Sequence, residues 1–98
     1  MVRHIVMWKI RNIDNRAADA QTVKSALDSL KDKIELIMAW EVGLDFSQNE
    51  EASADIVLNS TFKNAEDLLA YQNHPEHINV VQIIRPLTME RRVVDYYI

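Results

Sequence analysis

Hydrophobic residues in this chain change their spacing from one segment to the next, and this change constrains the fold more than any other feature. Residues 2–10 alternate in the period of two that a β-strand imposes, and they are rich in β-branched and aromatic residues. Residues 16–33 change to steps of three and four, the spacing of one apolar stripe on a helix. That stripe consists of Ala20, Val23, Leu27, Leu30 and Ile34. Residues 36–44 return to a period of two, so the first half of the chain predicts a strand, a helix and a second strand.

The second half of the chain repeats this order. The polar, acidic segment 45–54 predicts a surface loop, and residues 55–62 predict a third strand. Asn64 has the chemistry of a helix N-cap, which predicts a helix directly after it. Pro75 suits the first turn of a helix but not its interior, so we expect a break at residues 73–74 and a short helix from Pro75 to about Ile84. Residues 88–97 alternate again and predict the last strand.

The predicted order is strand–helix–strand twice over, which is the α+β arrangement called ferredoxin-like, βαββαβ. Right-handed crossovers place both helical segments on the same face of a four-stranded antiparallel sheet. No linker or low-complexity segment interrupts the pattern, so residues 1–98 are predicted to form a single domain.

The face of the sheet that the helices leave open is predicted to contact a second copy of the chain. In a monomer that face should be polar. Both sides of the first two strands carry apolar residues instead, and in the first strand Ile5 and Met7 alternate with Val6 and Trp8. Apolar faces left in water usually mark partner sites. We therefore expect a homodimer in which two sheets stack about a twofold axis as a closed α+β barrel.

Charge and composition exclude several classes of protein. The net charge of −4 argues against binding to nucleic acid or to an anionic membrane surface. The chain has no cysteine, which excludes disulfides, thiolate nucleophiles and cysteine zinc sites and fits a cytoplasmic protein. A single glycine excludes a glycine-rich phosphate loop. The apolar part of the N-terminal segment is too short and too charged for a signal peptide or a membrane span.

Several segments together resemble the stress-responsive A/B barrel family, the Dabb domain. They are the N-terminal HIVMWKI, the central ADIVLNSTF and NAEDLLAYQNHPEH, and the closing RRVVDYYI, and the similarity extends over essentially the whole chain. The most specific piece is the Tyr-x-x-His-Pro-x-His run at residues 71–77. Members of the family are dimeric α+β barrels, and most have no established activity. The resemblance therefore implies the same dimeric barrel for this chain.

One plant branch of the family is a polyketide cyclase that closes a ring by aldol condensation. The resemblance implies that its acid/base pair corresponds to Tyr71 and His77, and that a histidine of its first strand corresponds to His4. Asp55 stands where that branch has a further histidine, and many residues of the first helix differ as well. A histidine base and a phenol donor suit proton abstraction beside a carbonyl group. The alternative is that the Tyr71 hydroxyl bonds the backbone and His77 fixes the bend.

The other candidates are expected near this pair. His4 is either a satisfied core histidine or part of a pocket with Val6, Trp8 and His74, and His74 is also the expected cap of the helix that starts at Pro75. His74 and His77 at three-residue spacing are weak evidence for a metal, so we predict neither a metal site nor a cofactor. Ion pairs on the edge strand or between subunits are expected for Arg91, Arg92 and Asp95.

Three functions remain open. The first is a dimer with a pocket between helices and sheet that binds a small apolar or aromatic molecule. The second is a cofactor-free cyclase or isomerase with His77 as base and Tyr71 as acid. The third is a structural stress protein whose interior is filled by its own side chains. An open cavity with Tyr71, His77 and His4 directed inward favours the first two.

Overall fold

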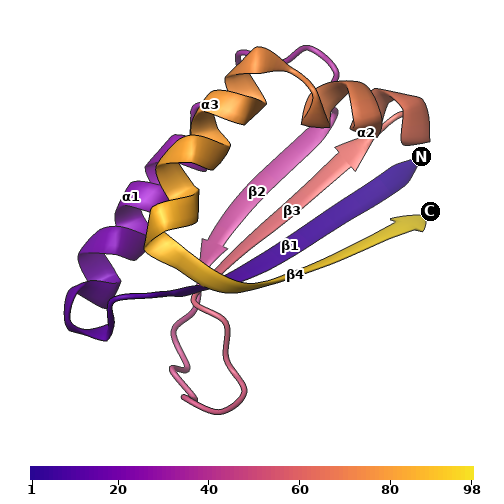
Figure 1. Ribbon diagram of the computed structural model, residues 1–98. Coiled ribbons are helices and arrows are strands. Elements are labelled where there is room, and N and C mark those ends of the chain that lie inside the picture. The colour runs from indigo at the N-terminus through magenta and orange to yellow at the C-terminus, as the bar shows by residue number, and fades with distance from the viewer.

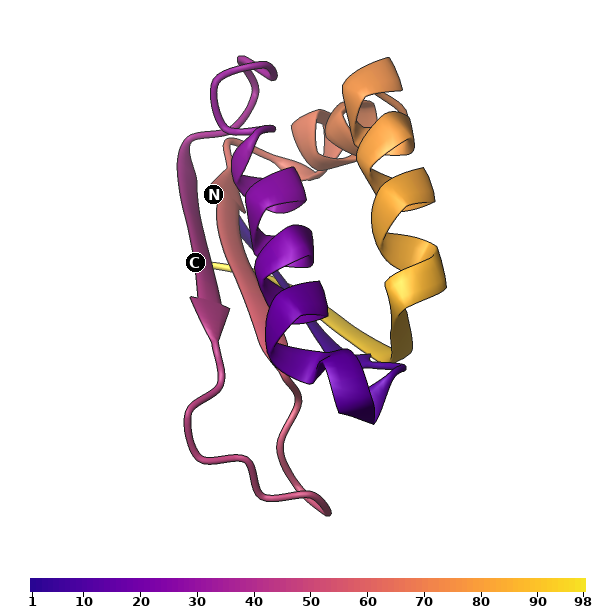
Figure 2. The ribbon, with the colours of Figure 1, turned by 90° about the vertical axis from the view of Figure 1, so that its left-hand side faces the viewer.

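The computed structural model describes residues 1–98 and consists of a four-stranded sheet with three α-helices on one face (Figures 1 and 2). The elements follow in the order β1 (Val2–Ile10), α1 (Arg16–Asp28), β2 (Ala39–Leu44), β3 (Ile56–Phe62), α2 (Ala65–Gln72), α3 (Pro75–Ile84) and β4 (Thr88–Tyr97). Two short 3₁₀ turns, η1 (Ile13–Asn15) and η2 (Arg85–Leu87), precede α1 and β4. The strand order is β2-β3-β1-β4 and every pair is antiparallel, so the predicted ferredoxin-like fold is confirmed.

The first helix is shorter than its apolar stripe predicts. It ends at Asp28 instead of Lys33, and β2 begins at Ala39 instead of residue 36. Leu30 and Ile34 are nevertheless fully enclosed, because turns continue past the helix and the Ile34 amide donates to the Leu30 carbonyl over 3.2 Å. Apolar spacing reports which residues are buried, and consecutive turns bury the same side as a helix does.

The break between α2 and α3 lies where the sequence predicts it. The Asn64 side chain caps α2 by accepting a hydrogen bond from the Asp67 amide over 2.8 Å. His74 caps α3, and its Nδ1 accepts from the Glu76 amide over 3.1 Å. Pro75 occupies the first turn of α3, where its missing N–H leaves no hydrogen bond unmade. The chain therefore changes direction between two capped helices.

The core lies between the helices and the sheet face that they cover. Strand register aligns Val6 with Leu58 and Val42, and Trp8 with Ile56, in rows across this face. The apolar stripe predicted for the first helix packs above these rows, and all five of its members are buried. No helix is long and apolar enough to cross a membrane.

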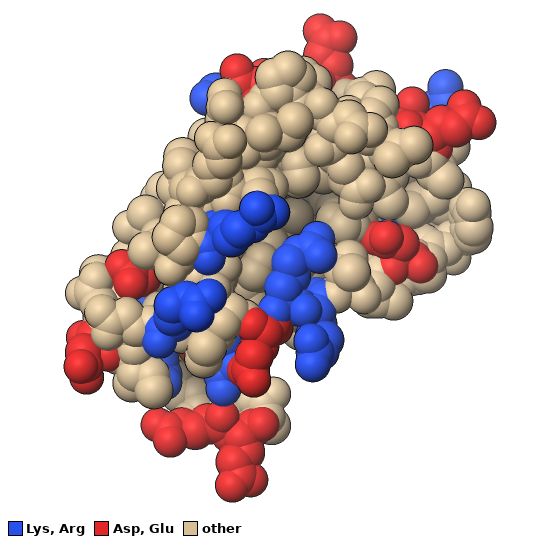
Figure 3. Space-filling view, in the orientation of Figure 1, with Lys and Arg blue, Asp and Glu red and all other residues tan.

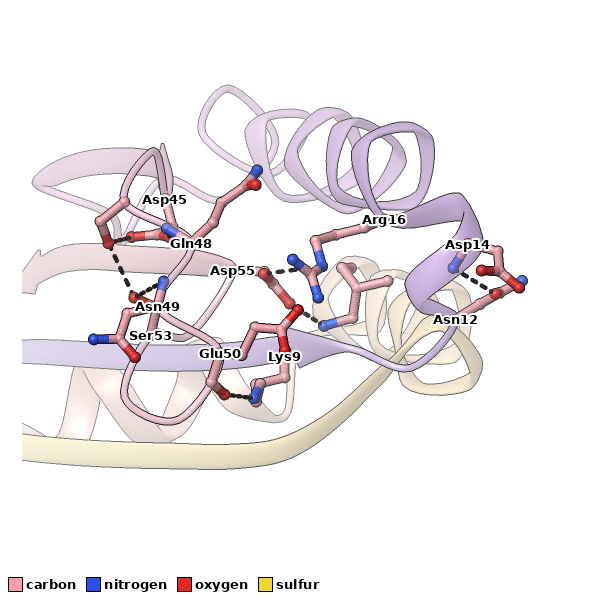
Figure 4. Close-up of polar contacts among 12 residues, drawn as sticks. Lys9, Asn12, Asp14, Arg16, Asp45, Gln48, Asn49, Glu50, Ser53 and Asp55 are labelled. Atoms are coloured by element: carbon pink, nitrogen blue, oxygen red, sulfur yellow. Dashed lines mark hydrogen bonds and ion pairs between the residues drawn. The ribbon is translucent and has the colours of Figure 1, made fainter.

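Asp55 links the end of β1 to the start of α1. Its carboxylate accepts a hydrogen bond from the Ile10 amide over 2.7 Å and lies 3.7 Å from the Arg16 Nε (Figure 4). The adjoining β2–β3 loop is tied to the same strand, because the Lys9 ammonium donates to the Glu50 carbonyl over 3.0 Å. Asp55 is therefore a buried structural carboxylate at the start of β3.

The opposite face of the sheet is uncovered, as Figure 2 shows from the edge. Met7, Val94 and Tyr96 lie on this face and are 41%, 51% and 39% exposed. Ile5 and Val57 lie beside them and are half-buried. The sequence predicts apolar side chains on the sheet face that the helices leave open, and the structure has them there.

Candidate functional site

A cavity of about 460 Å³ lies between the sheet and α3, within the range of pockets that hold small molecules. The strand β1 contributes His4, Val6 and Trp8, and α2 and α3 contribute Tyr71 and His77. The rest of the apolar wall consists of Leu27, Leu58, Val80, Val81, Ile84 and Met89. The interior between helices and sheet is therefore not completely filled by the protein's own side chains.

Tyr71 and His77 converge because the chain turns between them. Tyr71 lies in the last turn of α2 and His77 in the first turn of α3, on either side of the break at His74–Pro75. Their ring centroids are 4.6 Å apart. Tyr71 is only 1% exposed and also packs against Phe62, with ring centroids 4.8 Å apart. The helix break thus places a phenol and an imidazole side by side in the wall of the cavity.

The Tyr71 hydroxyl is available as a hydrogen-bond donor. It makes no hydrogen bond with the backbone. It is also not fully enclosed, because it is absent from the fully buried polar atoms that lack a partner. Burial raises the pKa of Tyr71 well above its ordinary value of 10.0, and the positive charge of Arg91 opposes that rise only in part. The phenol therefore stays protonated at neutral pH and can donate to an oxygen that gains negative charge.

His77 is held in one tautomer by the backbone. Its Nδ1 lies 2.9 Å from the Gln72 carbonyl oxygen. A carbonyl can only accept, so Nδ1 carries the proton in the neutral ring and Nε2 keeps its lone pair. Burial lowers the pKa of His77 below its ordinary value of 6.5, although the hydrogen bond to Gln72 raises it. At neutral pH the ring is consequently uncharged, with Nε2 free to accept a proton.

His4 is oriented by an acid on the neighbouring strand. Register places His4 directly opposite Asp95 of β4, and the His4 Nδ1 lies 2.5 Å from the Asp95 Oδ1. His4 is 2% exposed, and its ring centroid lies 6.2 Å from that of Tyr71. Asp95 is thus hydrogen-bonded within the chain to a residue of the cavity.

This geometry can be compared with known proteins. A family model described as the Stress responsive A/B Barrel Domain matches residues 2–98. The chain belongs to the Dabb family. No curated protein matches it.

Solved structures share the fold of this Dabb domain. A dimeric protein of unknown function from Bacteroides fragilis has a TM-score of 0.87 and 32% sequence identity, covering 99% of this chain and 95% of its own. A dimeric ferredoxin-like protein of unknown function from Thermobifida fusca has a TM-score of 0.84 and 24% identity, covering 99% and 90%. A hydroxynitrile lyase from Passiflora edulis has a TM-score of 0.83 and 20% identity, covering 99% and 92%. At the two lower identities the likeness extends to the fold alone.

His74 is placed differently from the other candidates. It does not line the cavity of this Dabb domain, because its ring is used to cap α3. The expectation that it belongs to the pocket is therefore wrong, and its expected role as a cap is what the structure shows. The chain contains no group of three or more His, Asp or Glu side chains arranged to hold a metal ion.

Sequence reasoning did not place six polar residues at the Dabb site. Asp95 was expected only as an ion-pairing residue, and its place opposite His4 follows from strand register, which the local pattern does not report. The other five, Arg11, Arg85, Thr88, Glu90 and Arg91, line the cavity itself, and Arg91 forms no ion pair of the kind expected for it. They come from three separate segments of the chain, so no local spacing could have grouped them.

Proposed function

We propose that this Dabb domain binds a small apolar or aromatic molecule in the cavity between the sheet and α3. The observation that carries the proposal is a mostly apolar cavity with Tyr71, His77 and His4 in its wall. Small-molecule sites usually combine a hydrophobic lining with a few polar groups that orient the ligand. The space left among the side chains also counts against the purely structural role.

A thermal-shift screen tests this proposal. Aromatic acids, β-keto compounds and polyketide mimics are added to the wild type, Tyr71→Phe and Tyr97→Phe, and each shift is measured against the same variant without ligand. Tyr97 is the matched control because it is 78% exposed and lies outside the cavity lining. We expect a stabilising compound whose shift decreases in Tyr71→Phe and not in Tyr97→Phe. A panel in which nothing stabilises the protein would favour the structural role.

We further propose that the domain works as a homodimer joined through the open face of the sheet. The apolar side chains on that face support this, and the similar proteins from Bacteroides fragilis and Thermobifida fusca are described as dimeric. The open face and the cavity lie on opposite sides of the sheet, so each subunit keeps its own cavity. Sedimentation equilibrium should give a dimer at micromolar concentration, and a monomer there would contradict the proposal.

The lack of cysteine supports a cytoplasmic location.

A second candidate function is proton transfer beside a carbonyl group, as in a cyclase or isomerase. It is favoured by the state of the two side chains, a neutral His77 with Nε2 free and a protonated Tyr71 with an unpartnered hydroxyl. His77 would remove a proton from the carbon next to the carbonyl. Tyr71 would donate a hydrogen bond to the enolate oxygen that forms. The enolate carbon would then attack a second carbonyl carbon of the ligand, whose oxygen takes the proton back from His77, or would itself be reprotonated by His77.

Deuterium exchange tests this chemistry without a known product. A bound β-keto compound in heavy water should exchange its acidic hydrogens faster with the wild type than without protein, as followed by NMR. The exchange rate should fall about 100- to 10,000-fold in His77→Gln, the usual range for loss of a general base. If His77→Gln binds the compound and exchanges it as fast as the wild type, His77 is not the base.

A further inference from the structure

The edge strand β4 is irregular beside the cavity. Met7 of β1 pairs with Arg92 and Lys9 pairs with Met89, so two residues of β4, Glu90 and Arg91, lie opposite Trp8 alone. Glu90 has a φ of 51°, in the left-handed region that residues other than glycine rarely adopt. This is a β-bulge, a feature often found next to functional sites, where it redirects a side chain.

The bulge turns Arg91 toward the cavity. Before it, Thr88 pairs with Ile10 on the helix-covered face, and after it Val93 pairs with Val6 on that same face. Even-numbered residues of β4 face the helices before the extra residue, and odd-numbered residues face them after it. Arg91 therefore lies on the face that the helices cover. Arg91 lines the cavity as a result.

Two further arginines reach the same opening from other elements. Arg11 follows β1 and its guanidinium donates to the Thr88 carbonyl over 2.9 Å, and Arg85 follows α3. All three arginines are exposed and line the cavity. Figure 3 shows Lys and Arg side chains gathered around the space between α3 and β4. The opening is thus cationic, although the chain has a net charge of −4.

Acidic residues of the protein do not neutralise these arginines. Glu90 is the one carboxylate in the cavity lining, and its Oε2 lies 3.9 Å from the Lys9 ammonium. None of the five ion pairs in the structure includes Arg11, Arg85 or Arg91. Three guanidinium groups without carboxylate partners at the mouth of an apolar cavity leave a place for an external anion.

We propose that the ligand of this cavity is an amphipathic anion, whose apolar body lies against Val6, Trp8 and Ile84 and whose carboxylate or similar anionic group is bound at the mouth by Arg91 and Arg85. The inference rests on the proposed small-molecule site and names its ligand class. A guanidinium binds a carboxylate through two parallel hydrogen bonds, which fixes the orientation of the ligand as well as its charge. The bound molecule would then extend from the arginines toward Tyr71 and His77.

A matched pair of ligands separates charge from shape. Phenylbutyrate and phenylbutyramide differ in the charge of one end, and their binding is measured by calorimetry and by tryptophan fluorescence, since Trp8 lies in the cavity wall. The wild type should bind the carboxylate about tenfold or more tightly than the amide, as expected for hydrogen bonds to a charged group. Added salt should weaken binding of the carboxylate and leave that of the amide unchanged.

Variants assign the preference to the arginines. Arg91→Gln and Arg85→Gln should each reduce the affinity for the carboxylate toward that for the amide, while amide binding persists and shows that the cavity is intact. Lys31→Gln is the matched control, because it removes the same charge from an exposed residue outside the cavity lining. Equal affinities of the wild type for the two ligands would overturn the anion inference and leave the pocket standing. Failure of both ligands to bind would overturn the pocket and this inference with it.

Discussion

Both faces of β1 carry apolar residues, yet these residues lie in very different surroundings. His4, Val6 and Trp8 face the helices and are at most 5% exposed. Met7, between Val6 and Trp8, faces away from the helices and is 41% exposed. Successive residues of a strand point to opposite sides, so helix coverage alone separates these neighbours. An apolar row on a strand therefore becomes part of the core or part of a partner surface according to what covers it.

The covered face differs from the open face in chemistry as well. Two of its polar groups are paired, since His4 contacts Asp95 and the Ser60 hydroxyl donates to the His4 carbonyl over 3.0 Å, whereas the Trp40 indole N–H has no partner. Such pairing is expected where water is excluded, because an unpaired buried polar group is costly. The covered face therefore holds both the core and the candidate site, whereas the open face offers contact area.

The two faces should differ most in how far a substitution lowers the free energy of unfolding. Phe62 is fully buried against Tyr71, so Phe62→Ala should lower the free energy of unfolding by about 3–5 kcal/mol. Val94→Ala on the open face should lower it by less than about 1 kcal/mol. Urea denaturation of both variants measures this, and similar losses would contradict the separation of core from open face.

Substitutions on the two faces of β4 should affect the proposed dimer differently. Val93 and Val94 are 47% and 51% exposed, but Val93 lies on the helix side and Val94 on the open face. Val94→Asp should weaken the proposed dimer at least about tenfold, about 1.4 kcal/mol, by placing a charge in an apolar contact. Val93→Asp, the matched control, should leave the dimer intact. Sedimentation equilibrium compares them, and equal effects would place the interface elsewhere.

A polar contact on the covered face should stabilise the fold more than an exposed ion pair does. Asp95→Ala leaves the buried His4 without its partner and should cost about 1–3 kcal/mol of stability. Asp28→Ala removes an exposed partner of Lys24 in α1 and should cost about 0.3–0.5 kcal/mol. Thermal unfolding of the two variants gives the comparison. Equal losses would mean that the Asp95–His4 contact behaves as a surface pair.

The smallest expected effect is a pH dependence from His77. Burial holds its folded pKa below the ordinary 6.5, so below pH 6.5 the unfolded chain binds more protons than the folded one. Its contribution to stability is therefore complete above pH 6.5 and is lost as the pH falls through the folded pKa. In His77→Gln the free energy of unfolding should decline less steeply between pH 7 and pH 5 than in the wild type, as measured by denaturation at fixed temperature. An unchanged slope would mean that His77 is not shielded from water.

The order of elements was predictable because it depends on local spacing and local chemistry. The alternation in β1, the cap at Asn64 and the break before Pro75 each depend on a few consecutive residues, and each is found in the structure. The end of α1 was not predictable, because Leu30 and Ile34 continue the apolar stripe through turns that are not helical. A burial pattern therefore locates the core better than it locates helix ends.

Two members of the candidate site, Tyr71 and His77, lie close together on either side of a break that is visible in the sequence, so the sequence suffices to group them. The partner of His4 was not visible, because Asp95 is 91 residues away and becomes a neighbour only through the pairing of β1 with β4. His74 belongs to the same sequence run, yet capping α3 keeps it out of the cavity.

The sequence by itself determined the βαββαβ order and the helix break between Tyr71 and His77, since these follow from periods and caps within short segments. Only the tertiary structure decided the register that joins His4 to Asp95, the bulge that turns Arg91 inward and the meeting of Arg11, Arg85 and Arg91 at the cavity mouth. The physical reason is that pairing between distant strands and packing of helices on a sheet depend on the whole chain at once. A local pattern specifies the type and order of the elements, and the fold decides which side of a strand is buried and what meets it there.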